Sequence, residues 1–208
     1  MATIDTVTLE VADTTAAHRF YTEAFGPDTP LRLRASDAPT DGFRGFILAL
    51  TVSQPADVDR LASAALAAGA TSLKPVTKSF WGYGAVIQAP DGTIWKIATS
   101  AKKNTGPATG TIDEFVILLG VDDMAATKRF YTARGLTVSK SFSRMYAEFD
   151  AGSGPVKLAL YRRRALAKDV GVPPEGTGSH RLLIGGGATP CTDPDGFAWE
   201  PVSQTVAP

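Results

Sequence analysis

Three short phrases occur twice in this chain, in the same order in each half. They are Thr-Ile-Asp, Arg-Phe-Tyr-Thr and Pro-Asp-Gly-x-x-Trp, which begin at residues 3, 19 and 90 and again at residues 111, 129 and 194. Recurrence of several phrases in one order indicates a tandem duplication. The duplication constrains the fold strongly, because each half must be able to form the same arrangement of strands and helices.

Composition excludes several classes of protein. The 208 residues carry 21 basic and 21 acidic side chains, so no overall charge attracts nucleic acid or an anionic membrane. No apolar run approaches the roughly 20 residues of a spanning helix, and the N-terminus lacks the pattern of a secretory signal. The one cysteine, Cys191, excludes an internal disulfide and favours a cytoplasmic protein.

Hydrophobic periodicity predicts strands and helices in alternation in the first half. One helix begins at Asp13 or Thr14 and ends near Gly26, and a second begins at Pro55 and ends at Gly69. The predicted strands cover residues 7–11, 31–35, 46–52, 71–76, 83–89 and 93–99. Two units of one strand, one helix and further strands therefore follow one another.

The second half begins in the same way and then becomes shorter. A helix capped by Asp122 or Asp123 is predicted there, with strands at 114–119, 136–141, 144–149 and 156–161. Phe46 and Lys96 are 50 positions apart, but their counterparts His180 and Glu200 are only 20 apart. The last unit therefore lacks a helix and about one strand. A basic segment rich in Pro and Gly, Arg162 to Gly178, stands before it.

The predicted organisation is α+β, with paired βαβββ modules in a tandem duplication and a truncated last module. The domains are predicted at 1–100 and 111–208, with the polar Gly/Pro-containing segment 101–110 as the linker.

The capped helix with Phe-Tyr and the closing hairpin Pro-Asp-Gly-x-x-Trp resemble the vicinal oxygen chelate superfamily. That group includes glyoxalase I, bleomycin-resistance proteins, fosfomycin-resistance enzymes, methylmalonyl-CoA epimerase and extradiol dioxygenases. The resemblance covers residues 3–26, 46–99, 111–136 and 178–202. It implies curved sheets with helices on the convex side and a ligand on the concave side, with half one as the complete copy. Relatives often pair modules between chains, which implies a homodimer.

The resemblance also identifies the positions where metal-dependent relatives bind their ion. In half one these are Thr6, Phe46 and Lys96, which are poor ligands for a divalent cation. In half two they are Glu114, His180 and Glu200, a set that suits Fe, Mn, Ni or Zn. Glu114 departs from the His or Gln usual in the superfamily.

A ligand-binding cleft is expected in half one. Phe80, Trp81 and Tyr83 form an aromatic stretch that suits a pocket wall, although core packing explains it equally well. Lys96 either binds an acidic ligand group or pairs with Glu10. Trp95 and Trp199 are predicted to be core residues, since the neighbouring Lys96 and Glu200 face the cleft. The full predicted ligand-binding set is Thr6, Thr8, Glu10, Phe46, Phe80, Trp81, Tyr83 and Lys96.

Two functions remain open at this point. One is a metal-free protein that binds a small metabolite or antibiotic in the cleft. The other is a metal-dependent lyase, isomerase or epimerase, or dioxygenase, with its site at Glu114, His180 and Glu200. No catalytic residue is assigned, and neither function involves nucleic acid or a membrane.

Overall fold

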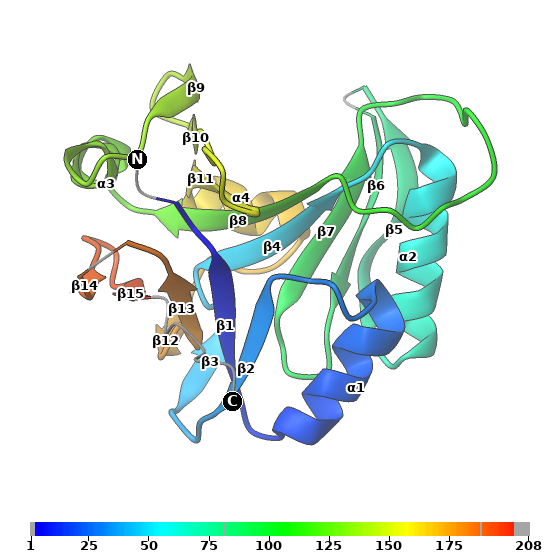
Figure 1. Cartoon of the computed structure of the whole chain (residues 1–208), viewed down its shortest axis with the longest axis horizontal. Coiled ribbons are helices and arrows are strands. Elements are labelled where there is room, and N and C mark those ends of the chain that lie inside the picture. Colours follow the sequence, from blue (N-terminus) through cyan, green and yellow to red (C-terminus); the bar gives the residue numbers. More distant parts are fainter. Residues whose placement is uncertain (1–2, 81, 188, 202–208) are drawn as a thin grey trace.

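A computed structural model describes residues 3–80, 82–187 and 189–201. In this part of the chain the fold is α+β, with four helices and strands arranged in three sheets (Figure 1). None of these helices is long and apolar enough to span a membrane.

The elements of the first half follow the predicted periodicity closely. They are β1 (Thr6–Val11), α1 (Thr14–Phe25), β2 (Leu31–Ala35), β3 (Thr40–Gly42), β4 (Phe46–Thr51), α2 (Pro55–Ala67), β5 (Thr71–Ser79), β6 (Gly82–Gln88) and β7 (Ile94–Thr99). Asp13 caps α1, because its Oδ1 accepts the backbone N–H groups of Thr15 and Ala16, each at 2.9 Å. Only the three-residue strand β3 was not predicted.

The second half contains one helix that the sequence analysis missed. Its elements are β8 (Glu114–Val121), α3 (Met124–Ala133), β9 (Val138–Phe142), β10 (Tyr146–Phe149), β11 (Val156–Arg162), α4 (Arg163–Val170), β12 (Gly176–Gly178), β13 (Leu182–Gly185), β14 (Cys191–Thr192) and β15 (Ala198–Glu200). Helix α4 lies in the basic segment Arg162 to Gly178, for which no helix was predicted. It ends at Gly171, which adopts the left-handed conformation (φ 82°) that favours glycine.

The larger sheet has eight strands, in the order β5-β6-β7-β4-β8-β11-β10-β9. Its centre is the antiparallel pair β4–β8, in which Leu48 lies opposite Ile117. The sheet therefore joins the second unit of the first half to the first unit of the second half, and each contributes four strands.

The smaller sheet has five strands, in the order β14-β15-β13-β1-β2. Strand β1 pairs antiparallel with β13, so the blue and orange ends of the described chain lie side by side (Figure 1). The sequence analysis paired the modules within each half, whereas the structure pairs them across the halves. The domain boundaries at 1–100 and 111–208 remain a prediction, and both sheets cross them.

Two apolar clusters lie on opposite faces of the larger sheet. On one face α1 and α2 pack on Trp95, whose ring is 0% exposed and lies 4.6 Å from the ring of Phe25. On the other face α4 packs Leu166, Ala167 and Val170 against residues such as Ile47 and Val86. The predictions that Trp95 and Trp199 are core residues are confirmed, since both are buried.

The repeated phrases contact each other within each half. The hydroxyl of Tyr21 donates to Asp91 in the first hairpin, and that of Tyr131 donates to Asp193 in the second, each at 2.6 Å. Burial, together with the neighbouring carboxylate, raises the pKa of both phenols well above the usual range. Each Arg-Phe-Tyr-Thr helix is thereby attached to the closing hairpin of its own half, through the Asp of Pro-Asp-Gly in the first half and through Asp193, which precedes that phrase, in the second.

The segment 101–110 is held against α2 by hydrogen bonds. The buried Asp57 accepts the backbone N–H groups of Thr109 and Gly110 at 2.6 and 2.7 Å. Gln54 accepts the N–H groups of Thr105 and Gly106. Desolvation alone would raise the pKa of Asp57, but these hydrogen bonds outweigh it and hold the pKa below its usual value. The connection between the halves is thus an ordered part of the structure.

Candidate functional site

The candidate site is a cavity of about 660 Å³ on the α4 side of the larger sheet. Strands β5, β6 and β7 form its floor and one wall, and the end of α4 borders it. Such a volume lies within the range of about 300–1,000 Å³ that is usual for small-molecule pockets.

Lys96 and Asp169 form an ion pair at the border of this cavity. Lys96 alternates with Trp95 and Ile97 on β7, so its side chain leaves the sheet on the face opposite α1 and α2. Its Nζ lies 2.6 Å from Oδ2 of Asp169, and the two side chains are 36% and 39% exposed. The partner of Lys96 is therefore Asp169 of α4, and not Glu10 as one alternative had it.

Lys74 of β5 binds the same end of α4 in a different way. Its Nζ donates to the backbone carbonyl oxygens of Lys168 and Asp169. These carbonyls belong to the last turn of the helix, where backbone acceptors lack partners and a cation is favourable. Lys74 is thus engaged in holding α4 against the sheet, while Lys96 balances the charge of Asp169.

The floor of the cavity is a row of small residues on three neighbouring strands. Gly84 lies opposite Ala98, and Ala98 lies opposite Thr51. A Cβ atom at Gly84 would lie 2.8 Å from the carbonyl oxygen of Ile97 and 3.2 Å from the Cβ of Ala98. Since no side chain fits there, the floor stays open and flat at this point.

The expected aromatic wall is only partly related to this cavity. Tyr83 borders it, but the phenol donates to Asp59 of α2 at 2.7 Å, on the other face of the sheet. Phe80 is 80% exposed at the adjoining β5–β6 turn, with Nζ of Lys102 at 5.7 Å from its ring centroid. Trp81 lies outside the residues that the structure describes.

The other residues of the predicted ligand-binding set lie elsewhere. Thr6, Thr8 and Glu10 are on β1 of the smaller sheet. Phe46 begins β4 of the larger sheet, but it is buried in the main core instead of facing the cavity. Of the seven members of this set that the structure describes, Lys96 and Tyr83 line the cavity and the other five do not. The reason is the pairing across halves, which separates β1 from β4 and β7.

The three proposed metal ligands lie on different parts of the fold. Glu114 is on β8 of the larger sheet, where it pairs with Lys157 of β11. The hydrogen bond with Glu114 raises the pKa of Lys157 above its usual value. Glu200 is on β15 of the smaller sheet, where it accepts from Thr8 at 3.1 Å and from Arg34 at 2.6 Å. Both carboxylates are therefore already bound to cationic side chains.

His180 has a structural environment. Its ring stacks on Phe197 with the centroids 4.1 Å apart. Its Nδ1 lies 2.5 Å from the carbonyl oxygen of Arg44, and its Nε2 lies 3.1 Å from that of Asp195. Both nitrogens thus face backbone acceptors, and neither is directed at a position where an ion could bind.

The residues present do not fit a metal centre of the superfamily type. Within 3–80, 82–187 and 189–201, no group of three or more His, Cys, Asp and Glu side chains is close enough to hold an ion. Glu114, His180 and Glu200 accordingly do not converge, and the larger sheet presents lysines beside its carboxylates.

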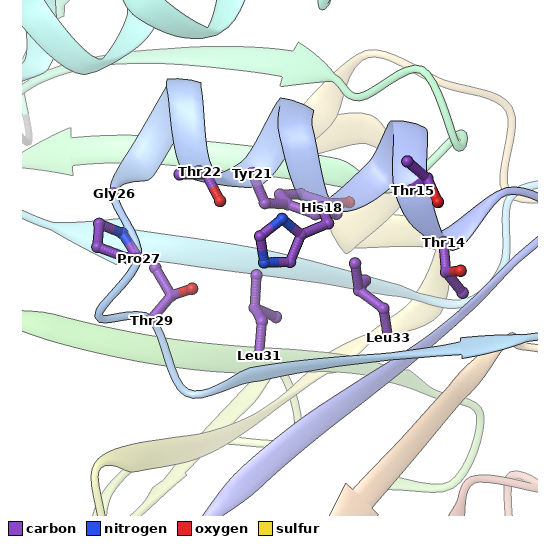
Figure 2. A pocket seen from close by; sticks show the side chains of 10 residues that line it. All are labelled: Thr14, Thr15, His18, Tyr21, Thr22, Gly26, Pro27, Thr29, Leu31 and Leu33. Atoms are coloured by element: carbon purple, nitrogen blue, oxygen red, sulfur yellow. The ribbon is translucent and has the colours of Figure 1, made fainter.

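A second cavity, of about 520 Å³, lies between α1 and the edge strand β2 (Figure 2). Its lining combines threonine hydroxyls and His18 from the helix side with Leu31 and Leu33 from the strand. His18 is exposed, as predicted for a helix surface position. This groove has no charged pair of the kind found at Lys96, and its lining offers little to orient a ligand.

No protein-family model matches this chain, and no curated protein matches its sequence significantly. Solved structures do match its fold. Glyoxalase I from Zea mays matches with a TM-score of 0.61 and 15% identity, over 96% of this chain and 91% of that one. A putative dioxygenase from Bacillus subtilis matches with a TM-score of 0.59 and 12% identity, over 88% of this chain and 69% of that one.

These similarities extend over nearly the whole chain, at identities that show the fold alone. They agree with the α+β sheets and the tandem units described above. The chain therefore has the tandem glyoxalase fold, the fold that its repeated phrases predicted.

Proposed function

We propose that this protein binds a small organic molecule in the cavity beside α4, without a metal ion. The observation that carries the proposal is the cavity of about 660 Å³ on the α4 side of the complete eight-stranded sheet. It combines a floor of small residues with one charged pair at its border, and such convergent polar groups orient ligands in mostly apolar pockets.

The proposal involves no metal ion because of the cationic side chains that lie near Glu114. Lys96 and Lys157 place ammonium groups on the same face of the sheet as Glu114. A divalent cation there would be repelled by both, and its binding would require Glu114 to leave Lys157. The competing function, a metal-dependent lyase, isomerase or dioxygenase, has no comparable support from the side-chain contacts.

The proposal can be tested by ligand-observed NMR with a library of small organic molecules. The variant Ala98→Trp places an indole on the cavity floor, where Ala98 is half-buried. Molecules that bind in the cavity of the natural protein should show no binding effect in their NMR signals with this variant. Ala98→Leu provides a milder obstruction if the larger side chain disturbs folding, and thermal unfolding monitors both.

A matched control places the same obstruction in the other cavity. His18→Trp fills the exposed groove between α1 and β2 and should leave binding unchanged. Binding that survives Ala98→Trp and Ala98→Leu but is lost with His18→Trp would refute the proposed site. Elemental analysis of protein purified without chelator tests the competing function, because about one Fe, Mn, Ni or Zn per chain would favour it.

A further inference from the structure

We infer that the ligand of this cavity is a small organic monoanion, such as a carboxylate. In the free protein the carboxylate of Asp169 occupies the position beside Lys96 that the acidic group of the ligand takes on binding. The inference rests on the proposed function and specifies the chemistry that the cavity selects.

The charges that line the cavity favour an anion. Among its described lining residues, Lys74 and Lys96 are cationic and Asp169 alone is anionic. The carboxylate of Asp169 balances one of the two lysines, so the lining keeps one net positive charge. A ligand with a single negative charge would neutralise it, whereas a cationic ligand would increase the repulsion.

The carboxylate of Asp169 in its ion pair with Lys96 can be replaced by a ligand carboxylate at little cost in free energy. Its two side chains are 36% and 39% exposed, so water solvates both groups while they are paired. Partly exposed pairs of this kind contribute little net stability. A ligand carboxylate can therefore replace that of Asp169 on Lys96 while the displaced side chain turns toward solvent.

The position of Asp169 on its helix makes the same exchange favourable. Asp169 is the second-last residue of α4, where the partial negative charge of the helix end disfavours a carboxylate. Lys74 binds the carbonyl oxygens of this last turn directly. The helix end thus stays attached to the sheet through Lys74 when the Asp169 side chain leaves Lys96.

The floor determines the shape that fits beside Lys96. Ala98 follows two residues after Lys96 on the same face of β7, and Gly84 lies opposite it with no side chain. Thr51 extends this row to the next strand. A flat ring can lie over these small residues with its acidic group directed to Nζ of Lys96.

The test uses three aromatic probes of similar size and different charge: benzoate, benzamide and benzylammonium. Their affinities are measured by titration into ¹⁵N-labelled protein at low salt. We expect benzoate to bind more tightly than the other two, and its affinity to fall as the ionic strength rises. Lys96→Met should weaken benzoate binding about two- to five-fold, while Lys96→Arg should retain it.

Asp169→Asn tests whether the carboxylate of Asp169 opposes the binding of an anion at Lys96. It removes the competing carboxylate at nearly constant side-chain size, so benzoate should bind about two- to five-fold more tightly. The matched control for Lys96→Met is Lys78→Met, because Lys78 is an exposed lysine of β5 outside the cavity lining. It removes the same charge and should change benzoate affinity less than two-fold.

The outcomes separate this inference from the proposed function. Unchanged or weaker benzoate binding by Asp169→Asn, or a preference for benzylammonium, would overturn the inference. Binding of benzamide that is lost with Ala98→Trp, together with no binding of benzoate, would also overturn it while leaving the proposed function intact. If no molecule of any charge is sensitive to Ala98→Trp, the proposed function itself fails.

Discussion

Replacement of Asp57 by alanine should loosen the connection between the two halves. The Asp57 side chain is 1% exposed, and its Oδ1 accepts three hydrogen bonds. They come from the N–H groups of Thr109 and Gly110, at 2.6 and 2.7 Å, and from the hydroxyl of Thr109, at 3.2 Å. Asp57→Ala removes all three and leaves two backbone donors without their acceptor.

The size of the effect follows from these contacts. A hydrogen bond to a charged group contributes about 1.5–3 kcal/mol net, and three bonds to a single oxygen are not additive. We expect the free energy of unfolding to fall by about 3–4 kcal/mol in Asp57→Ala. Asp57→Asn keeps an oxygen acceptor but loses the charge, so about 1–2 kcal/mol is expected. Urea denaturation followed by circular dichroism measures both.

The pH dependence provides a second measurement of the same contact. The pKa of Asp57 is below its usual value in the folded protein, so the carboxylate stabilises the fold at pH values above the unfolded pKa of about 3.9. That stability is lost as the pH falls through the folded pKa. The difference in unfolding free energy between the natural protein and Asp57→Asn should therefore shrink as the pH is lowered from 6 to 3.

The neighbouring Asp59 is the control for this prediction. It lies on the same helix, and its carboxylate accepts the exposed hydrogen bond from Tyr83. Asp59→Asn should cost less than about 1 kcal/mol. The reasoning would be refuted by a loss below about 1 kcal/mol in Asp57→Ala, or by a difference between the natural protein and Asp57→Asn that stays constant with pH.

Two further predictions concern the repeat and the sheet centre. Tyr131→Phe should lower the free energy of unfolding by about 1–2 kcal/mol, and Tyr21→Phe should lower it by less. The reason is that Asp193, the acceptor of Tyr131, is buried, whereas Asp91, the acceptor of Tyr21, is only half-buried. Equal losses in thermal or urea unfolding would contradict this prediction. Gly120→Ala should cost about 1–3 kcal/mol, because its Cβ would lie 2.8 Å from a backbone oxygen of the loop before β4; Gly106→Ala, with nothing within 4 Å, is its control and should change stability by under about 0.5 kcal/mol.

Most of the secondary structure could be predicted because its signals are local. Alternation within a strand and a capping aspartate act over a few residues, so β1, α1, β4 and α2 appear at their expected positions. The same alternation correctly predicted that Lys96 and Trp95 leave β7 on opposite faces. Local pattern therefore predicted the faces of these two residues.

Pairing between strands could not be predicted in the same way. Alternation states which face of a strand is buried, but it does not state which other strand lies beside it. The sequence analysis paired neighbouring units along the chain, and the structure instead pairs β4 with β8 and β1 with β13. The predicted ligand-binding set was consequently divided between two sheets.

The candidate functional residue that the sequence analysis missed, Asp169, lies on helix α4. Leu166, Ala167 and Val170 have helical spacing, and Gly171 follows as a terminator. This signal is present, but the segment was described only by its basic residues and its Pro and Gly content, and no helix was predicted there. Without α4, Asp169 could not be identified as the partner of Lys96, which lies 73 positions earlier in the chain.

Pairing across the halves also sets the order in which a growing chain can complete its sheets. Thr8 of β1 binds Glu200 of β15, 192 positions later in the chain. At synthesis rates of about 5–20 residues per second, about 10–40 s pass between the emergence of these two residues from the ribosome. During this interval the apolar side of β1, with Val7 and Leu9, lacks the neighbour β13 that pairs with it in the finished fold. Strand β1 therefore emerges before the other strands of its sheet but is completed only after β13 has followed it.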